Sequence, residues 1–207
     1  MATGVDPTSA LEALEALVLA AGAGSRFGGG KLLAPWRDGL LLHGALAAAF
    51  AAPTRTVTLV WGADPRVAEA AQAWATAHGE QSRLRLVEAK AHAQGLSASL
   101  QAGLASLPAD CGGAFVFLGD MPRVSAEILQ PLAQALATGA AAAAPVFEGR
   151  RGHPVLLGSG LFRAVAALEG DRGAGPLLSE LGPALATVQA ADDGVLYDID
   201  RPQDLSE

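Results

Sequence analysis

The 207-residue sequence contains a single cysteine and no long apolar run. One cysteine, Cys111, excludes an internal disulfide and a zinc site built from several cysteines, and it is typical of a reducing compartment. No apolar run approaches the roughly 20 consecutive residues that a membrane-spanning helix requires. We therefore expect no insertion into a membrane.

Basic residues are also scarce, because 14 Lys and Arg face 21 Asp and Glu, which gives a formal net charge of −7. Such a surface disfavours nucleic acid and anionic bilayers as partners. The N-terminal residues include Asp6, Glu12 and Glu15 but no Lys or Arg before the first apolar run, which is the wrong charge for a secretory signal. We expect a cytoplasmic protein in which any anionic ligand meets a locally basic site.

Short apolar runs alternate with longer segments rich in Ala and Leu, and this alternation is typical of βαβ units. The expected strands are residues 16–20, 56–60, 84–88, 114–118, 141–147, 154–157 and 185–189. The expected helices are residues 40–51, 65–78, 97–107 and 125–138, with Ser97 and Ser125 as N-caps. The pattern predicts one α/β domain over residues 1–207, with a loose tail at residues 1–12.

A glycine-rich segment, "AAGAGSRFGGGKLL", follows the first expected strand. It departs from the P-loop pattern, because Ser25 replaces the first glycine and Leu32 follows the lysine. It also departs from the dinucleotide pattern at Phe27, which makes an NAD-dependent dehydrogenase the weaker alternative. A merely flexible turn would explain the glycines but not the cations Arg26 and Lys31. Backbone amides exposed by glycine, together with two cations, indicate a polyphosphate site.

Aspartates follow two further apolar segments. Asp120 ends the run "AFVFLG", and Asp198 and Asp200 lie in "LYDIDRPQDL", at the end of what reads as a short strand. Mg²⁺ is typically held by one or two carboxylates and completes its coordination with phosphate oxygens and water. We expect Asp120 and Asp200 to bind Mg²⁺, with Asp198 as the competing second ligand.

Six segments resemble, in order and approximate spacing, those of the molybdenum cofactor nucleotidyltransferases. They are "LAAGAGSRFGGGKLL", "QGLSASLQAGL", "FVFLGDMPRV", "GRRGHPVLLG", "GDRGAGPLL" and "DIDRPQDL". The similarity covers residues 17–205 and is greatest to the branch that transfers cytidylyl groups. It implies an α/β, three-layer, Rossmann-like nucleotidyltransferase fold with a mixed, mostly parallel sheet. It also implies transfer of a nucleoside monophosphate to a phosphorylated acceptor, with release of pyrophosphate.

The same resemblance implies roles for individual residues. The nucleotide is expected to contact Ala21, Gly22, Ala23, Gly24, Arg26, Lys31, Gly95 and Ser97. The residues expected to act in catalysis are Arg26, Lys31 and Asp120, and those expected to bind Mg²⁺ are Asp120 and Asp200. The residues expected at the acceptor are Arg151, His153, Asp171 and Arg172. A structural role for His153 is an equal alternative.

The substrates implied are CTP and the molybdenum cofactor. A guanylyl- or other nucleotidyltransferase with a different small phosphorylated acceptor is one alternative, and a non-catalytic protein that delivers the cofactor is another. The delivery of a cofactor also implies a transient contact with a recipient molybdoenzyme.

Overall fold

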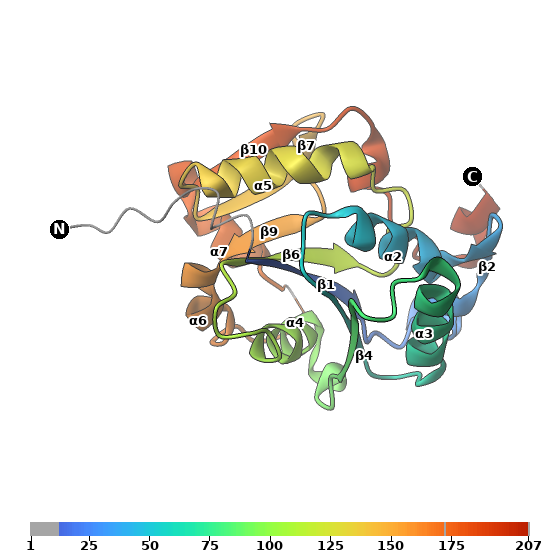
Figure 1. The fold of residues 1–207 in the computed structure, drawn as a ribbon. Helices are drawn as coiled ribbons and strands as arrows, with labels where there is room; N and C mark the ends of the chain where they lie inside the picture. The colour runs from blue at the N-terminus through green and yellow to red at the C-terminus, as the bar shows by residue number, and fades with distance from the viewer. Residues whose placement is uncertain (1–12, 172, 207) are drawn as a thin grey trace.

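The computed structural model describes residues 13–171 and 173–206, so the tail expected at residues 1–12 and Arg172 lie outside the described residues. Its main feature is an eight-stranded sheet with the strand order β10-β7-β9-β6-β1-β4-β5, in which β8 pairs with β7 (Figure 1). The strands β9 and β8 run antiparallel to their neighbours, and the other pairs are parallel. The expectation of a mixed, mostly parallel sheet is confirmed.

The strands of this sheet are β1 (Leu14–Ala20), β4 (Val57–Trp61), β5 (Leu84–Glu88), β6 (Gly113–Leu118), β7 (Ala142–Phe147), β8 (Arg150–Arg151), β9 (Val155–Gly158) and β10 (Leu185–Gln189). A separate hairpin consists of β2 (Pro35–Trp36) and β3 (Gly39–Leu40). The α-helices are α2 (Leu41–Ala51), α3 (Arg66–His78), α4 (Leu96–Ala105), α5 (Leu129–Ala137), α6 (Phe162–Val165) and α7 (Gly175–Glu180). The 3₁₀ helices are η1 (Ser25–Phe27), η2 (Lys31–Leu33), η3 (His92–Gln94), η4 (Ala126–Ile128), η5 (Ser159–Leu161), η6 (Gly182–Ala184), η7 (Asp193–Val195) and η8 (Pro202–Ser206).

Helices cover both faces of the sheet, which gives three layers (Figure 1). The central strand β1 is buried along its whole length, and its side chains alternate between the two faces. Leu14, Ala16 and Val18 pack in the cluster that includes residues of α2, α3 and α5. Leu17 and Leu19 pack in the cluster that includes residues of α4, α6 and α7. Within the described residues, no helix is both long and apolar enough to span a bilayer.

Two local expectations are wrong. The helix expected to begin at Ser97 begins at Leu96 with Gly95 as its N-cap, and the Ser97 side chain makes no capping bond. The strand expected just before Asp198 and Asp200 does not form, and residues 197–200 have no regular secondary structure. A backbone hydrogen bond of 3.0 Å from Ile199 N to Asp120 O connects them to the segment that follows β6. Ser125 does cap the turn that begins at Ala126, as expected.

A buried ion pair lies near the start of β1, at the end of the sheet opposite to the glycine loop. The Glu15 side chain is 1% exposed. Its carboxylate accepts hydrogen bonds from Arg55 Nε at 2.9 Å, Thr56 N at 3.0 Å and Thr56 Oγ1 at 2.6 Å. Because water cannot solvate Glu15, these three donors replace its hydration.

Replacing Arg55 by methionine should therefore lower the free energy of unfolding by about 2 kcal/mol, because the Glu15 charge keeps only the two donors of Thr56. Chemical denaturation followed by tryptophan fluorescence measures the change. The matched control is Arg66→Met, which removes the exposed ion pair between Arg66 and Asp64 and should leave the denaturation midpoint unchanged. Equal losses in the two variants would contradict the importance of burial at Glu15.

Candidate active site

The sheet topology brings the glycine-rich loop and Asp120 to one edge. Strands β1 and β6 are parallel neighbours, with Leu19 paired to Leu118. Residues 21–30 follow β1 directly and Asp120 follows β6 after one residue, so both segments lie at the carboxyl ends of adjacent strands. Open α/β sheets bind ligands at this edge.

The loop after β1 adopts a backbone that favours glycine. Gly24, Gly28, Gly29 and Gly30 all have positive φ values, from 60° to 95°. A Cβ atom on Gly24 would also lie 3.0 Å from the Cβ atom of Lys31. The amides of residues 22–26 donate no hydrogen bond to any residue that the structure describes. Residues 22 and 23 are exposed. These amides are available to an anionic ligand.

Four of the residues expected in the site form one ion-pair cluster. Lys31 Nζ lies 2.6 Å from Asp120 Oδ2 and 3.5 Å from Asp200 Oδ1. Arg26 Nη1 lies 3.1 Å from Asp200 Oδ2. The Lys31 side chain is only 13% exposed, so its ammonium interacts with Asp120 more strongly than a surface pair would. The structure therefore places Lys31 against both expected metal ligands and Arg26 against Asp200.

The same arrangement fits a divalent cation. Two carboxylates, Asp120 and Asp200, converge on one ammonium nitrogen, so this position already favours positive charge. Among the described residues, no group of three or more His, Cys, Asp or Glu side chains could hold a metal. Two carboxylates with open positions are the donor set of a Mg²⁺ ion that also binds phosphate and water, and not of a metal enclosed by protein.

Asp198 differs from Asp200. Its carboxylate makes no ion pair with the described residues, whereas Asp200 pairs with Arg26 and Lys31. Desolvation first, and then the charges of Asp120 and Asp200, raise the pKa of Asp198 above its ordinary value. Because Asp200 shares the Lys31 ammonium with Asp120, we propose Asp200 as the second ligand.

A residue without an expected role holds Asp200 in place. The Asp204 Oδ2 atom accepts hydrogen bonds from Asp200 N at 3.1 Å and from Arg201 N at 2.8 Å. The Tyr197 hydroxyl donates to Asp204 O at 3.0 Å. An aspartate shortly after a proline is a common turn residue, and this was the only available signal in the sequence. Asp204 therefore fixes the backbone at the proposed metal ligand.

Arg151 and His153 line a small cavity of about 180 Å³ beside the ends of β1 and β6. Arg151 Nη2 donates to Gly175 O at 3.2 Å and to Ser179 Oγ at 3.3 Å. The His153 ring contacts Val116 O through Nδ1 at 3.4 Å. Gly173, Ala174 and Gly175, and the start of α4, complete the wall. Two of the four residues expected at the acceptor, Arg151 and His153, thus line the same cavity.

The other expected residues gather at the start of α4. Gly95 is the N-cap, and the Ser97 hydroxyl is buried without a hydrogen-bond partner in the described part of the chain. Asp171, expected at the acceptor, accepts a hydrogen bond from Leu96 N at 3.0 Å. The structure therefore joins a residue expected at the acceptor to the segment expected to meet the nucleotide.

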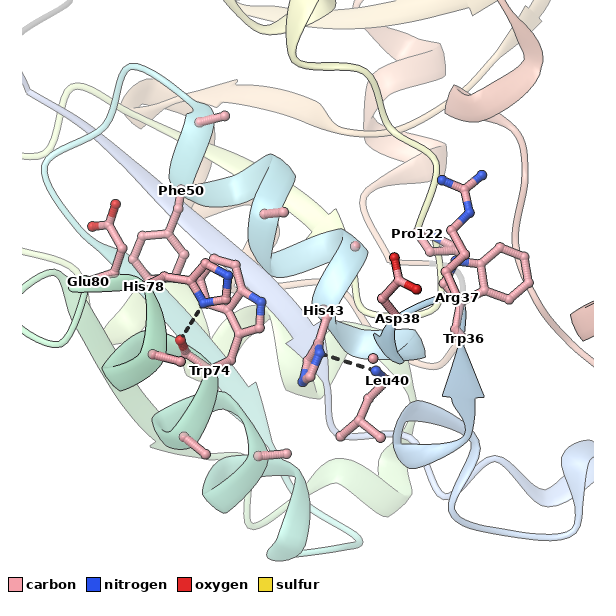
Figure 2. Close-up of a pocket in the computed structure, with 17 residues that line it drawn as sticks. Trp36, Arg37, Asp38, Leu40, His43, Phe50, Trp74, His78, Glu80 and Pro122 are labelled. Atoms are coloured by element: carbon pink, nitrogen blue, oxygen red, sulfur yellow. Dashed lines mark hydrogen bonds between the residues drawn. The ribbon is translucent and has the colours of Figure 1, made fainter.

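A larger cavity of about 970 Å³ lies between α2, α3 and the β2–β3 hairpin (Figure 2). The aromatic side chains that line it are those of Trp36, His43, Phe50, Trp74 and His78. It contains no residue of the ion-pair cluster or the glycine loop. Its walls bear charges of both signs without a cationic cluster, so it does not suit a triphosphate.

The pKa of His153 is lowered, and the largest cause is burial. The hydrogen bond to Val116 O raises this pKa by a smaller amount. The folded protein therefore keeps the ring neutral at a pH at which the unfolded chain binds a proton. The stability due to this neutral ring is complete above the unfolded pKa of about 6.5 and is lost as the pH falls below it.

We expect the free energy of unfolding to fall between about pH 7.5 and about pH 5.5, by at most about 1.4 kcal/mol per pH unit for one proton. His153→Gln should make this decline shallower, without abolishing it, because burial also lowers the pKa of His43. Denaturation at several pH values measures the slope. His92→Gln is the control, because His78 acts electrostatically on His43, and an equal change of slope in both variants would contradict the role of His153.

The chain is similar to known proteins both in sequence and in fold. Residues 16–185 match the model of the MobA-like NTP transferase domain. The chain is 26% identical over 200 residues to the molybdenum cofactor cytidylyltransferase of Escherichia coli, with 94% of each protein covered.

Solved structures with this fold include Rv0371c from Mycobacterium tuberculosis. It is 25% identical, with a TM-score of 0.77, over 93% of this chain and 96% of that chain. A second structure of Rv0371c, in complex with manganese, has a TM-score of 0.69 and 24% identity over 86% of this chain and 88% of that chain. These likenesses agree with the three-layer α/β nucleotidyltransferase fold.

Proposed function

Because the chain belongs to the MobA-like NTP transferase family, and is therefore a nucleotidyltransferase, we propose that it transfers CMP from CTP to the phosphate of the molybdenum cofactor and releases pyrophosphate. One observation carries this proposal above all: the cluster of Lys31, Asp120 and Asp200 lies at the strand ends that also present free amides. The similarity to a cytidylyltransferase favours CTP over GTP. We propose further that the whole chain acts as one nucleotidyltransferase domain.

In the proposed reaction, an oxygen of the acceptor's phosphate attacks the α-phosphorus of CTP in line with the leaving group. A new P–O bond forms, the bond from the α-phosphorus to the bridging oxygen breaks, and pyrophosphate leaves with the electron pair. The loop amides and the cations Arg26 and Lys31 bind the β- and γ-phosphate oxygens, where negative charge increases in the transition state. No covalent nucleophile from the chain is required.

The residues that would hold Mg²⁺ are Asp120 and Asp200. When bound, the metal supplies positive charge that reduces the repulsion between the two reacting phosphates. The manganese in the related Rv0371c structure supports a divalent cation, since oxygen ligands suit both Mn²⁺ and Mg²⁺. Asp204 keeps Asp200 in place, and the contact of Ile199 N with Asp120 O connects the two ligands.

The acceptor is proposed to enter beside Arg151 and His153. Arg151 is exposed and carries a positive charge that suits a phosphate, while the neutral His153 ring can exchange hydrogen bonds with a pterin edge. After transfer, a recipient molybdoenzyme would take the product in a transient contact.

The decisive experiment incubates the purified protein with Mg²⁺, molybdenum cofactor and one nucleoside triphosphate at a time, and measures pyrophosphate release. We expect release with CTP and little with ATP, GTP or UTP. Release with GTP alone would contradict the nucleotide assignment. Tight binding of nucleotide without release of pyrophosphate, in the presence of the cofactor, would contradict catalysis and favour a delivery protein.

A further inference from the structure

The first turn of α4 is capped by residues far away in the sequence. Leu96 N donates a hydrogen bond of 3.0 Å to Asp171 Oδ1, across a separation of 75 residues. The next amide, Ser97 N, donates to Gly170 O at 3.2 Å. The helix has no side-chain cap of its own, because its N-cap is Gly95. Two amides that a helix start leaves unpaired are therefore satisfied by one distant turn.

The contact between this turn and α4 is close on both sides. Gly95 has a φ of 109°, and a Cβ atom there would lie 2.7 Å from Gly170 O. A Cβ atom on Gly173 would lie 2.9 Å from Leu96 Cδ2. Glycine at position 95 is thus required for the two backbones to approach, whereas at Gly173 the positive φ of 52° favours glycine.

The segment before the turn is attached to the same helix. Gln101 Nε2, in the second turn of α4, lies 2.7 Å from Leu168 O and 3.1 Å from Val165 O. Residues 165–171 are therefore connected to α4 at two levels, by the amide group of Gln101 and by the carboxylate of Asp171. On the first turn, the carboxylate of Asp171 is the side chain that accepts, beside the backbone oxygen of Gly170.

This turn joins the two halves of the candidate active site. The start of α4 contains Gly95 and Ser97, which are expected to contact the nucleotide and which we place at its base and sugar. Gly173, Ala174 and Gly175, just after the turn, line the cavity that contains Arg151 and His153. One side chain, that of Asp171, connects the segments proposed for the nucleotide and the acceptor.

We propose that Asp171 is a positioning residue that holds the start of α4 in the conformation that binds the nucleotide, and that it does not contact the acceptor. This inference rests on the proposed function. A carboxylate at the N-terminus of a helix accepts from free amides and complements the helix dipole. Because the base and sugar take no part in bond making, disorder at this turn weakens nucleotide binding and leaves the chemical step intact.

The test compares Asp171→Ala with Asp171→Asn. Alanine should raise the KM for CTP about tenfold, with kcat and the KM for the acceptor nearly unchanged. Asparagine keeps an oxygen that can accept from Leu96 N, so it should restore most of the affinity. The matched control is Glu169→Ala, which removes an exposed carboxylate from the same segment without removing the cap and should behave as the wild type.

A second measurement is independent of activity. Amide hydrogen exchange, followed by mass spectrometry, should be faster for the peptide that contains residues 95–97 in Asp171→Ala and close to the wild-type rate in Asp171→Asn. A rise in the KM for the acceptor, with CTP binding and exchange unchanged, would overturn the proposal. An asparagine variant as impaired as the alanine variant would overturn it too.

These results also separate the two proposals. If the wild type binds CTP but releases no pyrophosphate, the proposed function fails, while CTP affinity measured by calorimetry and the exchange rates still decide the role of Asp171. If the wild type binds no nucleoside triphosphate, both proposals fail.

Discussion

Replacing Lys31 by alanine is expected to lower kcat about a hundredfold or more while leaving the fold intact. The reason is the position of the ammonium, which lies 2.6 Å from Asp120 and beside the free amides of the glycine loop. In the proposed reaction, this charge stabilises the pyrophosphate as it leaves. The loss of one such contact typically costs on the order of 3 kcal/mol in the transition state.

Steady-state pyrophosphate release at saturating CTP and acceptor measures the effect. The control is Lys90→Ala, which removes an exposed lysine after β5 and should leave kcat unchanged. Circular dichroism checks that both variants are folded. A Lys31→Ala variant with kcat near that of the wild type would remove the lysine from the mechanism.

The same variant tests the electrostatics of the site without turnover. In the wild type, the Lys31 ammonium competes with a metal for Asp120 and Asp200. Without it, Asp120 loses its ion pair and Asp200 keeps only the exposed Arg26, so Mg²⁺ alone should bind more tightly to Lys31→Ala than to the wild type. A loss of activity together with a gain in metal affinity is the signature of an electrostatic role, because general misfolding would weaken both.

The sequence predicts the long elements well and the short ones poorly. The strands expected at residues 84–88 and 185–189 have exactly those bounds as β5 and β10. The hairpin β2–β3, the strand β8 and the helices α6 and α7 were not predicted. The three strands contain two residues each, which is too few to show an alternation, and the helices contain four and six residues, which is fewer than two helical turns.

For the candidate site, the sequence predicts those positions that follow from the pairing of parallel strands. Once β1 and β6 are neighbours, the glycine loop and Asp120 must lie at one edge. The supports of Asp200 and Leu96 could not be predicted, because Asp204 and Asp171 act through backbone amides that fold into place only in three dimensions. Ser97 illustrates the failure: a local cap was expected, and a residue 75 positions from Leu96 supplies it.

Replacing Asp120 by asparagine should lower kcat about a hundredfold or more, because the side chain keeps its shape but loses the charge that a divalent cation requires. Asp200→Asn should have the same effect for the same reason. Both variants should also need a higher Mg²⁺ concentration for half-maximal pyrophosphate release, whereas a variant that only weakens nucleotide binding would keep the wild-type metal dependence. A Mg²⁺ titration at saturating CTP measures this shift.

Asp198→Asn distinguishes the two possible second ligands. Asp200 shares the Lys31 ammonium with Asp120 and Asp198 does not, so the loss of the Asp198 charge should change the metal dependence much less than the loss of Asp200. Asp110→Asn, at the opposite edge of the sheet beside Arg55, controls for the loss of any surface carboxylate. If Asp198→Asn instead shifts the Mg²⁺ dependence more than Asp200→Asn, the ligands are Asp120 and Asp198. The pairing of Asp200 with Arg26 and Lys31 would then position the cations and not the metal.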